Sequence, residues 1–238
     1  LFQDDRSRNI ITGRIAEIIG FASKSENLPN VLDKFTDSFN GVFVDLDPKE
    51  LEKIKKSDLV KAIHPNRKFD PLLADSVPLI NADDVWNLLD SNGNNIKGNG
   101  ISVSVIDTGI DYRHPDLGGC FGNNCKVKGG YDFVNNDNDP MDDHGHGTHV
   151  AGIIAADGTL KGVAPNAELY AYKVCDASGC WEDDILAGIE YSLDPNQDKN
   201  FGDHLDIISM SLGGKGNPDD PLSNAIDNVV DFGIVTVI

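Results

Sequence analysis

The spacing of hydrophobic and polar positions changes along the chain, and its first part predicts a small α+β unit. Apolar residues alternate with polar ones over Phe39–Leu46, which predicts a β-strand. Asp47-Pro48 then predicts the start of a helix over Lys49–Lys56, because Asp caps a helix and Pro suits its first turn. Val60–His64 predicts a second strand, and Leu28–Phe39 predicts a further helix.

From residue 101 onward, short β-branched runs alternate with helical segments. The predicted strands cover residues 101–106, 168–174, 205–210 and 233–238, and the predicted helices cover 147–156, 182–193 and 220–231. This alternation is typical of an α/β fold with a parallel sheet and helices on both faces. Prolines and Asn-Gly clusters before it indicate a connector with a short helix at 82–89. The sequence therefore predicts three parts: residues 1–68, 69–100 and 101–238.

Charge separates the same parts of the chain. Residues 1–70 hold 12 Lys and Arg and 12 Asp and Glu, so the whole net charge of −19 lies in residues 71–238. This acidity argues against a nucleic-acid partner, because phosphate binding needs a basic face. It is compatible with calcium or basic substrates, although a solvated acidic surface accounts for most of it. No apolar run approaches the roughly 18 residues of a membrane span.

Two residues at the ends of predicted elements suggest a catalytic pair. Asp107 ends the strand at 101–106, and the carboxyl end of a buried parallel strand is where functional groups of such sheets lie. His146 lies at the start of the helix predicted for 147–156. A histidine can transfer protons near neutral pH because its ordinary pKa is about 6.5. A buried aspartate that orients a histidine is the supporting half of a Ser-His-Asp triad.

Five motifs, in order, resemble those of the subtilisin-like serine proteases. They are Val105-Ile-Asp-Thr-Gly-Ile-Asp111, His114-Pro-Asp-Leu117, His146-Gly-Thr-His-Val-Ala-Gly152, Gly162-Val-Ala-Pro165 and Ser209-Met-Ser-Leu-Gly-Gly214. The resemblance implies peptide-bond hydrolysis through an acyl-enzyme without a chemical cofactor. It implies Asp107 as the orienting aspartate and His146 as the general base. It also implies that Ser211, Leu212 and Gly213 pair with the backbone of a protein or peptide substrate.

Two segments of that family's pattern do not occur in residues 1–238. The nucleophilic serine of the family lies in Gly-Thr-Ser-Met-Ala, and its oxyanion-hole asparagine lies in Ala-Gly-Asn. In the family, a strand like the one at 233–238 runs directly into that asparagine. We therefore expect residues 1–238 to be the N-terminal part of a longer protease precursor and to be inactive alone. A non-catalytic form that acts as a propeptide-type inhibitor or binding module is the alternative, and the gene beyond Ile238 distinguishes the two.

Residues Phe39–Lys68 resemble the subtilisin propeptide family. Its members have an antiparallel sheet with two helices on one face, assist folding of the protease, and block its cleft with their C-terminal tail. The resemblance implies that residues 1–68 are a propeptide whose partner is the protease's own cleft. It also implies maturation cleavage between about residues 66 and 78. A generic small α+β domain is the alternative.

Four cysteines form two pairs, Cys120/Cys125 and Cys175/Cys180, each with four residues between the partners. Glycines flank or lie within the pairs, which favours two local disulfides. Disulfides are typical of exported proteins, so we expect a secreted, extracellular protein. Free thiols, or a zinc site built from both pairs, are the alternative.

The segment Asp132–Asp143 is crowded with oxygen ligands, and calcium binds six to eight oxygens. Some thermostable subtilases hold calcium in this loop, which implies Asp132, Asp137 and Asp139 as ligands of a structural calcium. An acidic surface turn is the alternative. A second calcium site of the family uses a longer loop than Ala156–Gly162, so we do not expect it here, although Asp116 is kept.

The histidines also allow a metal-site interpretation. His144, His146 and His149 resemble the His-rich motif of the metallo-β-lactamase superfamily. That motif has an aspartate directly before its third histidine, where this chain has Thr148. The triad interpretation is therefore preferred.

Overall fold

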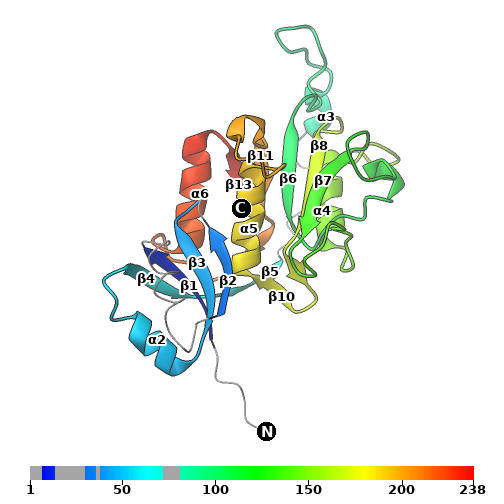
Figure 1. Ribbon diagram of the computed structural model, residues 1–238. Helices are drawn as coiled ribbons and strands as arrows, with labels where there is room; N and C mark the ends of the chain where they lie inside the picture. The colour runs from blue at the N-terminus through cyan, green and yellow to red at the C-terminus, as the bar shows by residue number, and fades with distance from the viewer. Residues whose placement is uncertain (1–6, 14–29, 36–37, 72–80) are drawn as a thin grey trace.

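The computed structural model describes residues 7–13, 30–35, 38–71 and 81–238 (Figure 1). Within these ranges, the larger part of the molecule is organised around a parallel sheet with the strand order β13-β11-β6-β8-β7. Its strands are β6 (Ser102–Asp107), β7 (Val127–Asp132), β8 (Glu168–Lys173), β11 (Ile207–Ser209) and β13 (Val235–Val237).

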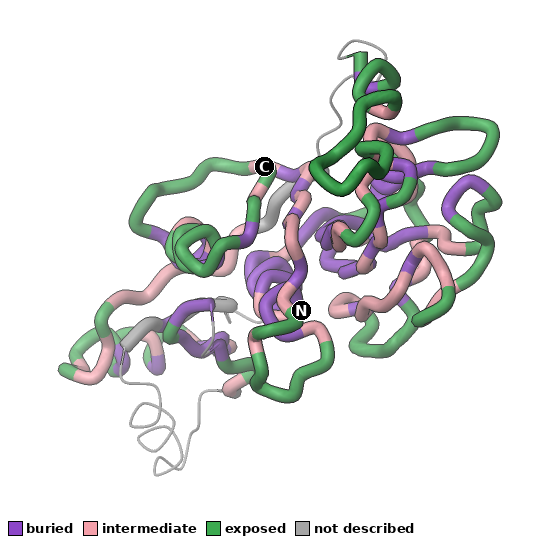
Figure 2. Tube along the Cα trace, turned by 90° about the horizontal axis from the view of Figure 1, so that it is seen from above, coloured by how far each residue is buried: buried purple, intermediate pink, exposed green. Residues whose placement is uncertain are grey.

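Helices cover both faces of this sheet because alternate strand residues point to opposite sides. The helices are α4 (His146–Ala155), α5 (Glu182–Leu193) and α6 (Pro221–Phe232). Val103 and Val105 pack with Val150 of α4 on one side. Ile106 packs with Ile185 of α5 on the other. Buried positions accordingly concentrate at the centre of the molecule, where α5 lies (Figure 2). The predicted α/β class is confirmed.

The N-terminal unit is an antiparallel sheet with the order β2-β3-β1-β4. Its elements are β1 (Ser7–Gly13), β2 (Asn30–Phe35), β3 (Gly41–Leu46), α2 (Pro48–Ile54) and β4 (Val60–Pro65). Helix α2 begins where the sequence predicts. The Asp47 carboxylate accepts hydrogen bonds from the N–H groups of Lys49 at 2.7 Å and Glu50 at 2.8 Å. The Glu50 carboxylate accepts one from the Asp47 N–H, which completes a capping box.

Two predictions about helices need correction. The helix predicted over Leu28–Phe39 is wrong for its described part, because residues 30–35 form β2 and pair with β3. Phe35 is buried against Phe39, so this tertiary packing overrides the local pattern. The helix predicted at 82–89 is shorter, since α3 covers only Ala82–Val85. Two short 3₁₀ helices cover Pro115–Leu117 and Phe201–Asp203.

The N-terminal unit packs against α5 and α6. Phe35, Phe39 and Phe43 belong to the same apolar cluster as Ile185 and Ile189 of α5. Polar contacts fix this docking at one point: the Ser38 N–H and hydroxyl both donate to the Glu190 carboxylate, and the Asn228 side chain donates to the Ser38 carbonyl. The two parts therefore share a continuous core.

A third sheet joins the two parts. Strand β5 (Lys68–Pro71) lies between β10 (Gly179–Trp181) and β12 (Leu212–Gly213), antiparallel to both, and β9 (Cys175–Asp176) pairs with β10. The chain that leaves β4 thus enters the larger part of the molecule as an extended strand. In the described part of the chain, no helix has the length and apolar character needed to cross a membrane.

Candidate active site

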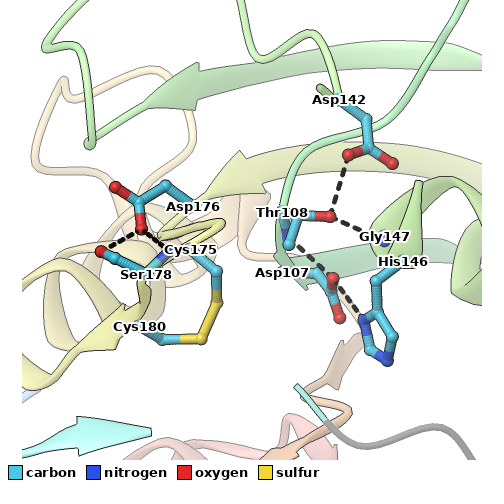
Figure 3. The surroundings of a disulfide bond; sticks show 9 residues. All are labelled: Asp107, Thr108, Asp142, His146, Gly147, Cys175, Asp176, Ser178 and Cys180. Atoms are coloured by element: carbon cyan, nitrogen blue, oxygen red, sulfur yellow. Dashed lines mark hydrogen bonds and ion pairs between the residues drawn. A yellow bond between two sulfur atoms is a disulfide. The ribbon is translucent and has the colours of Figure 1, made fainter. Parts of the chain in front are cut away.

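The structure brings together the two residues predicted to form a catalytic pair (Figure 3). Asp107 ends β6, and His146 is the first residue of α4. Nδ1 of His146 lies 2.7 Å from Oδ1 of Asp107; the Asp107 side chain is 1% exposed and that of His146 is 9% exposed. Nε2 of His146 has no hydrogen-bond partner among the described residues. An N–H at Nδ1 that donates to the carboxylate leaves Nε2 able to accept a proton.

The surroundings of Asp107 make its charge depend on His146. Burial raises the pKa of the Asp107 carboxyl above its ordinary value, against the opposing effect of the bonds from His146 and the Thr108 N–H. A buried carboxylate of this kind is stabilised by a neighbouring cation. The 2.7 Å contact with Nδ1 of His146 places the imidazole ring directly against this carboxylate.

A hydrogen-bond network around Asp142 fixes the start of α4, and therefore the position of His146. Its carboxylate accepts from the N–H groups of His144, Gly145 and Thr148, each at 2.9 Å. The Thr108 hydroxyl donates to Asp142 and accepts from the Gly147 N–H. Gly145 itself provides no side-chain cap, so these groups satisfy the free N–H groups at the helix start.

Gly147 allows α4 to lie against the end of β6. A Cβ at this position would lie 2.1 Å from the Gly109 carbonyl oxygen and 3.1 Å from Oδ1 of Asp107. Any larger residue would push the helix away from the strand. The glycine is therefore part of the geometry that holds His146 at Asp107.

Lys173 supports the loop that leads into α4. Its side chain is 1% exposed, and Nζ lies 2.6 Å from Oδ1 of Asp143 and 3.2 Å from the Met141 carbonyl oxygen. Lys173 is also the strand partner of Asp107 in the register of β6 and β8. The roles of Lys173, Thr108 and Asp142 were not predicted from the sequence, because they depend on contacts between separate loops and strands.

We expect Asp142→Asn to destabilise the protein by on the order of 1 kcal/mol, because an amide nitrogen would face N–H donors in this half-buried network. Burial raises the pKa of Asp142, but the bonds from Thr148 and from backbone N–H groups lower it more, to below its ordinary 3.8. The stabilisation from ionised Asp142 is therefore fully present above about pH 3.8 and is lost as pH falls through the folded-state pKa.

Denaturant unfolding of the wild type and Asp142→Asn between pH 7 and pH 3 measures this effect. The difference in unfolding free energy should be largest near neutral pH and should shrink below pH 3.8. Asp231→Asn, at an exposed position of α6, is the control and should show no comparable loss. A difference that grows towards acid would contradict the proposed role of the carboxylate.

The predicted substrate strand lies beside β5. Leu212 pairs with Pro71, and Gly213 pairs with Asp70, whereas Ser211 directly precedes β12. On the other side of β5, residues 180–181 of β10 pair with Phe69 and Lys68. Two strands of the larger part thus hold one extended peptide between them. We call the space between β10 and β12, which β5 occupies, the peptide track. The family resemblance implied β12 as one border of this track, and β10, which ends at Trp181, forms the other.

Both predicted disulfides are confirmed. Cys120 and Cys125 are bonded with Cα atoms 5.6 Å apart, and Cys175 and Cys180 with Cα atoms 4.1 Å apart. The second disulfide is fully buried and joins β9 to β10, close to the catalytic pair (Figure 3). It therefore fixes one border of the peptide track. All four cysteines are bonded, which excludes the zinc alternative for these thiols.

The predicted calcium ligands bind groups of the protein. Asp132 accepts from the Asn135 N–H and side-chain amide, Asp137 accepts from the Asp139 N–H, and Asp139 accepts from the Tyr112 hydroxyl. Their carboxylate oxygens do not all lie within 4.8 Å of one another, as the ligands of one metal ion would. Among the described residues, a cluster that meets this distance is formed by Asp194, Asp198 and Asp203. The arrangement gives no support to the predicted ligand set.

Asp116 has protein partners in place of the second calcium site. Its carboxylate accepts from the N–H groups of Thr159 at 2.9 Å and Leu160 at 3.1 Å. Gly158 allows this contact, since a Cβ there would lie 1.9 Å from Oδ1 of Asp116. The short turn after α4 thus supplies two backbone donors to the Asp116 carboxylate.

The histidine-based metal alternative finds no support. His144 is exposed, and its ring centroid lies 6.5 Å from that of His146. His149 is exposed one turn further along α4. In the part of the chain that the structure describes, these histidines do not belong to a cluster of metal-ligand atoms.

Asp107 and His146 are arranged as the aspartate and histidine of a Ser-His-Asp triad are, with the extended strand β5 held between β10 and β12. Comparison with known proteins identifies the family. Residues 98–238 match the subtilase family, and residues 9–70 match the peptidase inhibitor I9 family. The chain therefore belongs to the subtilase family.

Curated relatives include two proteases of Bacillus subtilis (strain 168). Minor extracellular protease Vpr is 37% identical over 227 residues, which cover 84% of this chain and 26% of that protein. Subtilisin E is 36% identical over 201 residues, which cover 82% of this chain and 48% of that protein. The chain thus spans from about a quarter to about half the length of these relatives.

Solved structures confirm the subtilisin-like fold. Fervidolysin from Fervidobacterium pennivorans aligns with a TM-score of 0.67 and 22% identity, over 99% of this chain and 40% of that chain. The epidermin leader peptide processing serine protease of Staphylococcus aureus aligns with a TM-score of 0.71 and 17% identity, over 98% of this chain and 59% of that chain.

Proposed function

We propose that the full-length protein to which residues 1–238 belong is a serine endopeptidase of the subtilisin type. The observation that carries this proposal is the 2.7 Å contact of His146 with Asp107, which leaves Nε2 free. Strands β10 and β12 hold an extended peptide in the same part of the molecule. The substrates are accordingly proteins or peptides that bind as a strand.

In this proposal, His146 Nε2 takes the proton of a serine hydroxyl as its oxygen attacks the scissile carbonyl carbon. His146 then gives the proton to the leaving amine, and a water molecule hydrolyses the acyl-enzyme through the same base. Asp107 holds the imidazole in its tautomer and stabilises the imidazolium. The Gly-Thr-Ser-Met-Ala and Ala-Gly-Asn segments do not occur in residues 1–238, so the proposal assigns the serine and the oxyanion donor to the full-length protein and involves no cofactor.

We also propose that residues 1–68, followed by β5, act as the protease's own propeptide. The match of residues 9–70 to an inhibitor family supports this role. So does β5, which pairs with β10 and β12 as a bound substrate would. The residues around β5 fall within the range of 66–78 expected for maturation cleavage.

Export of the protein is part of the same proposal. Two disulfides in this chain favour an oxidising compartment. The relative named minor extracellular protease Vpr is consistent with it. Detection of the mature protein in culture medium, with both disulfides intact, is the direct measurement.

Labelling of the full-length protein with a serine-directed fluorophosphonate tests the catalytic proposal. We expect one serine to be labelled and peptide hydrolysis to stop in parallel. An unlabelled protein that hydrolyses no peptide but inhibits subtilisins would instead establish the non-catalytic, propeptide-type function. Activity that resists the fluorophosphonate and is lost with a chelator would favour metal-dependent hydrolysis.

The calcium hypothesis is tested by thermal melting of the full-length protein with and without calcium. If Asp132, Asp137 and Asp139 bind calcium, a hundredfold excess over Kd should stabilise the folded state by about 2.7 kcal/mol. The melting temperature should then rise with calcium. The triple variant Asp132→Asn/Asp137→Asn/Asp139→Asn should lose that rise. An identical calcium response in both proteins would exclude this ligand set.

A further inference from the structure

Arg67 links the N-terminal unit to two acidic residues of the protease part. Its Nη2 lies 2.6 Å from Oδ2 of Asp220 and 3.2 Å from Oε1 of Glu182. Its Nη1 donates to the Lys215 carbonyl oxygen at 2.5 Å. One guanidinium therefore satisfies two carboxylates and a carbonyl group, which matches the fork of donors that arginine presents.

The two carboxylates are buried and fixed by the protease part itself. The Glu182 side chain is 0% exposed and that of Asp220 is 7% exposed. Glu182 lies in the first turn of α5, and Asp220 caps α6 by accepting from the Ser223 N–H at 2.8 Å. Both carboxylates therefore lie at helix N-termini, which favour negative charge.

The pKa shifts of Asp220 and Arg67 are consistent with an ion pair between the two side chains. Burial raises the pKa of Asp220, but the bonds from Ser223, Asn217 and Arg67 lower it more, so that the pKa is below its ordinary value. Burial lowers the pKa of Arg67, but Glu182 and Asp220 raise it more. Buried carboxylates that lose their cation are strongly destabilised, so this pocket requires a positively charged occupant.

The pocket lies on the peptide track defined by β10. Glu182 directly follows Trp181, the last residue of β10. The Glu182 N–H donates to the Arg67 carbonyl oxygen at 3.0 Å, so backbone pairing continues past Lys68 to Arg67. A substrate bound in this register places one side chain between the two carboxylates. That residue stands two positions before the one that pairs with Cys180.

We propose that Glu182, Asp220 and the Lys215 carbonyl group form a guanidinium-binding subsite, which selects protein substrates with arginine at this position. The proposal rests on the proposed protease function and specifies its substrates. Arg67 occupies the subsite in the precursor, and a substrate arginine replaces it in the mature enzyme. Lysine fits less well, because a single ammonium cannot reach all three acceptors with a planar fork.

Steady-state kinetics of the mature full-length enzyme test this subsite. The substrates are internally quenched peptides of the sequence of residues 66–74, with Arg67 retained or replaced by Arg67→Lys or Arg67→Gln. For the wild type we expect Arg67→Gln to raise KM about tenfold or more, equivalent to 1.4 kcal/mol, with little change in kcat. Arg67→Lys should be intermediate.

Variants of the enzyme test whether Glu182 and Asp220 cause the preference for arginine. In Glu182→Gln/Asp220→Asn the arginine and glutamine peptides should have similar KM values. Asn at position 220 retains a side-chain oxygen that can cap α6, which limits effects on folding. Asp219→Asn is the matched control, because Asp219 is an exposed neighbour outside the contacts of Arg67, and it should keep the wild-type preference.

Equal KM values for the arginine and glutamine peptides in the wild type would overturn the proposal. A preference that survives in Glu182→Gln/Asp220→Asn would also overturn it, by locating the selection elsewhere. Failure to hydrolyse all three peptides would overturn the protease function instead. Fluorescence anisotropy of a labelled peptide of residues 66–71 needs no turnover, and then decides whether arginine improves binding by at least about tenfold.

Discussion

His146→Ala is expected to lower kcat of the full-length protein by about 10⁶, the scale found when a subtilisin loses its catalytic histidine or serine. The reason is the position of His146, whose Nε2 is the free base beside the peptide track and whose Nδ1 is held by Asp107 at 2.7 Å. Asp107→Asn should lower kcat by about 10⁴, because the amide would stabilise the wrong tautomer. Active-site-titrated kinetics on one peptide substrate measure both.

His149→Ala is the matched control. His149 lies in the same helix one turn after His146, but its side chain is exposed. We expect its kcat to stay within a few-fold of the wild type. If His149→Ala and His146→Ala were equally damaging, the three-histidine metal interpretation would regain support. An uncut chain in His146→Ala, beside a processed wild type, would show that maturation uses the protein's own triad.

Gly147→Ala is expected to lower kcat/KM by about 10² and to destabilise the fold by about 1–3 kcal/mol. The added Cβ would lie 2.1 Å from the Gly109 carbonyl oxygen, so α4 must move away from β6. That movement would lengthen the contact between His146 and Asp107. Kinetics and denaturant unfolding of the full-length protein measure the two effects.

Gly152→Ala provides the comparison within the same helix. A Cβ at Gly152 meets no atom within 4 Å, and alanine is favoured over glycine in a helix by about 0.5–1 kcal/mol. This variant should be as active as the wild type and equally or more stable. Full activity in Gly147→Ala would show that the close approach of α4 to β6 is not needed for catalysis.

The sequence predicted the sheet and the catalytic pair because both leave local signals. Strands β6, β8, β11 and β13 overlap the predicted apolar runs, and each helix shows its apolar face within a dozen residues. Strand β7 was not predicted, because its sequence, VKGGYD, has a Gly-Gly pair and no apolar run. Asp107 and His146 stand where such elements end and begin, and parallel strands bring their carboxyl ends to one edge of the sheet. Their contact, across 39 positions of sequence, therefore follows from topology.

Features set by tertiary packing could not be predicted in this way. Arg67 meets Glu182 and Asp220 across 115 and 153 positions of sequence, and nothing in the local sequence of any of the three marks the contact. Strand β2 was predicted as a helix, because its pairing with β3 and the burial of Phe35 decide its conformation.

The acidic loop shows why composition alone does not place ligands. Asp132, Asp137 and Asp139 are close in sequence, but Asp132 and Asp137 pair through their backbones as an isolated bridge. Their carboxylates turn to different donors of the protein, including the side chain of Asn135 and the hydroxyl of Tyr112. Proximity along the chain therefore does not by itself show that the three carboxylates share a ligand, and calcium binding by them stays a prediction.

The insertion of β5 between β10 and β12 makes inhibition a question of effective concentration. While residues 1–71 are joined to the protease part, their binding is intramolecular, and short tethers give effective concentrations in the millimolar range. Cleavage after β5 would turn the same contacts into a bimolecular complex that dilution can separate. Under the proposed propeptide role, a concentrated population would thus remain inhibited, whereas diluted molecules would become active without any further signal.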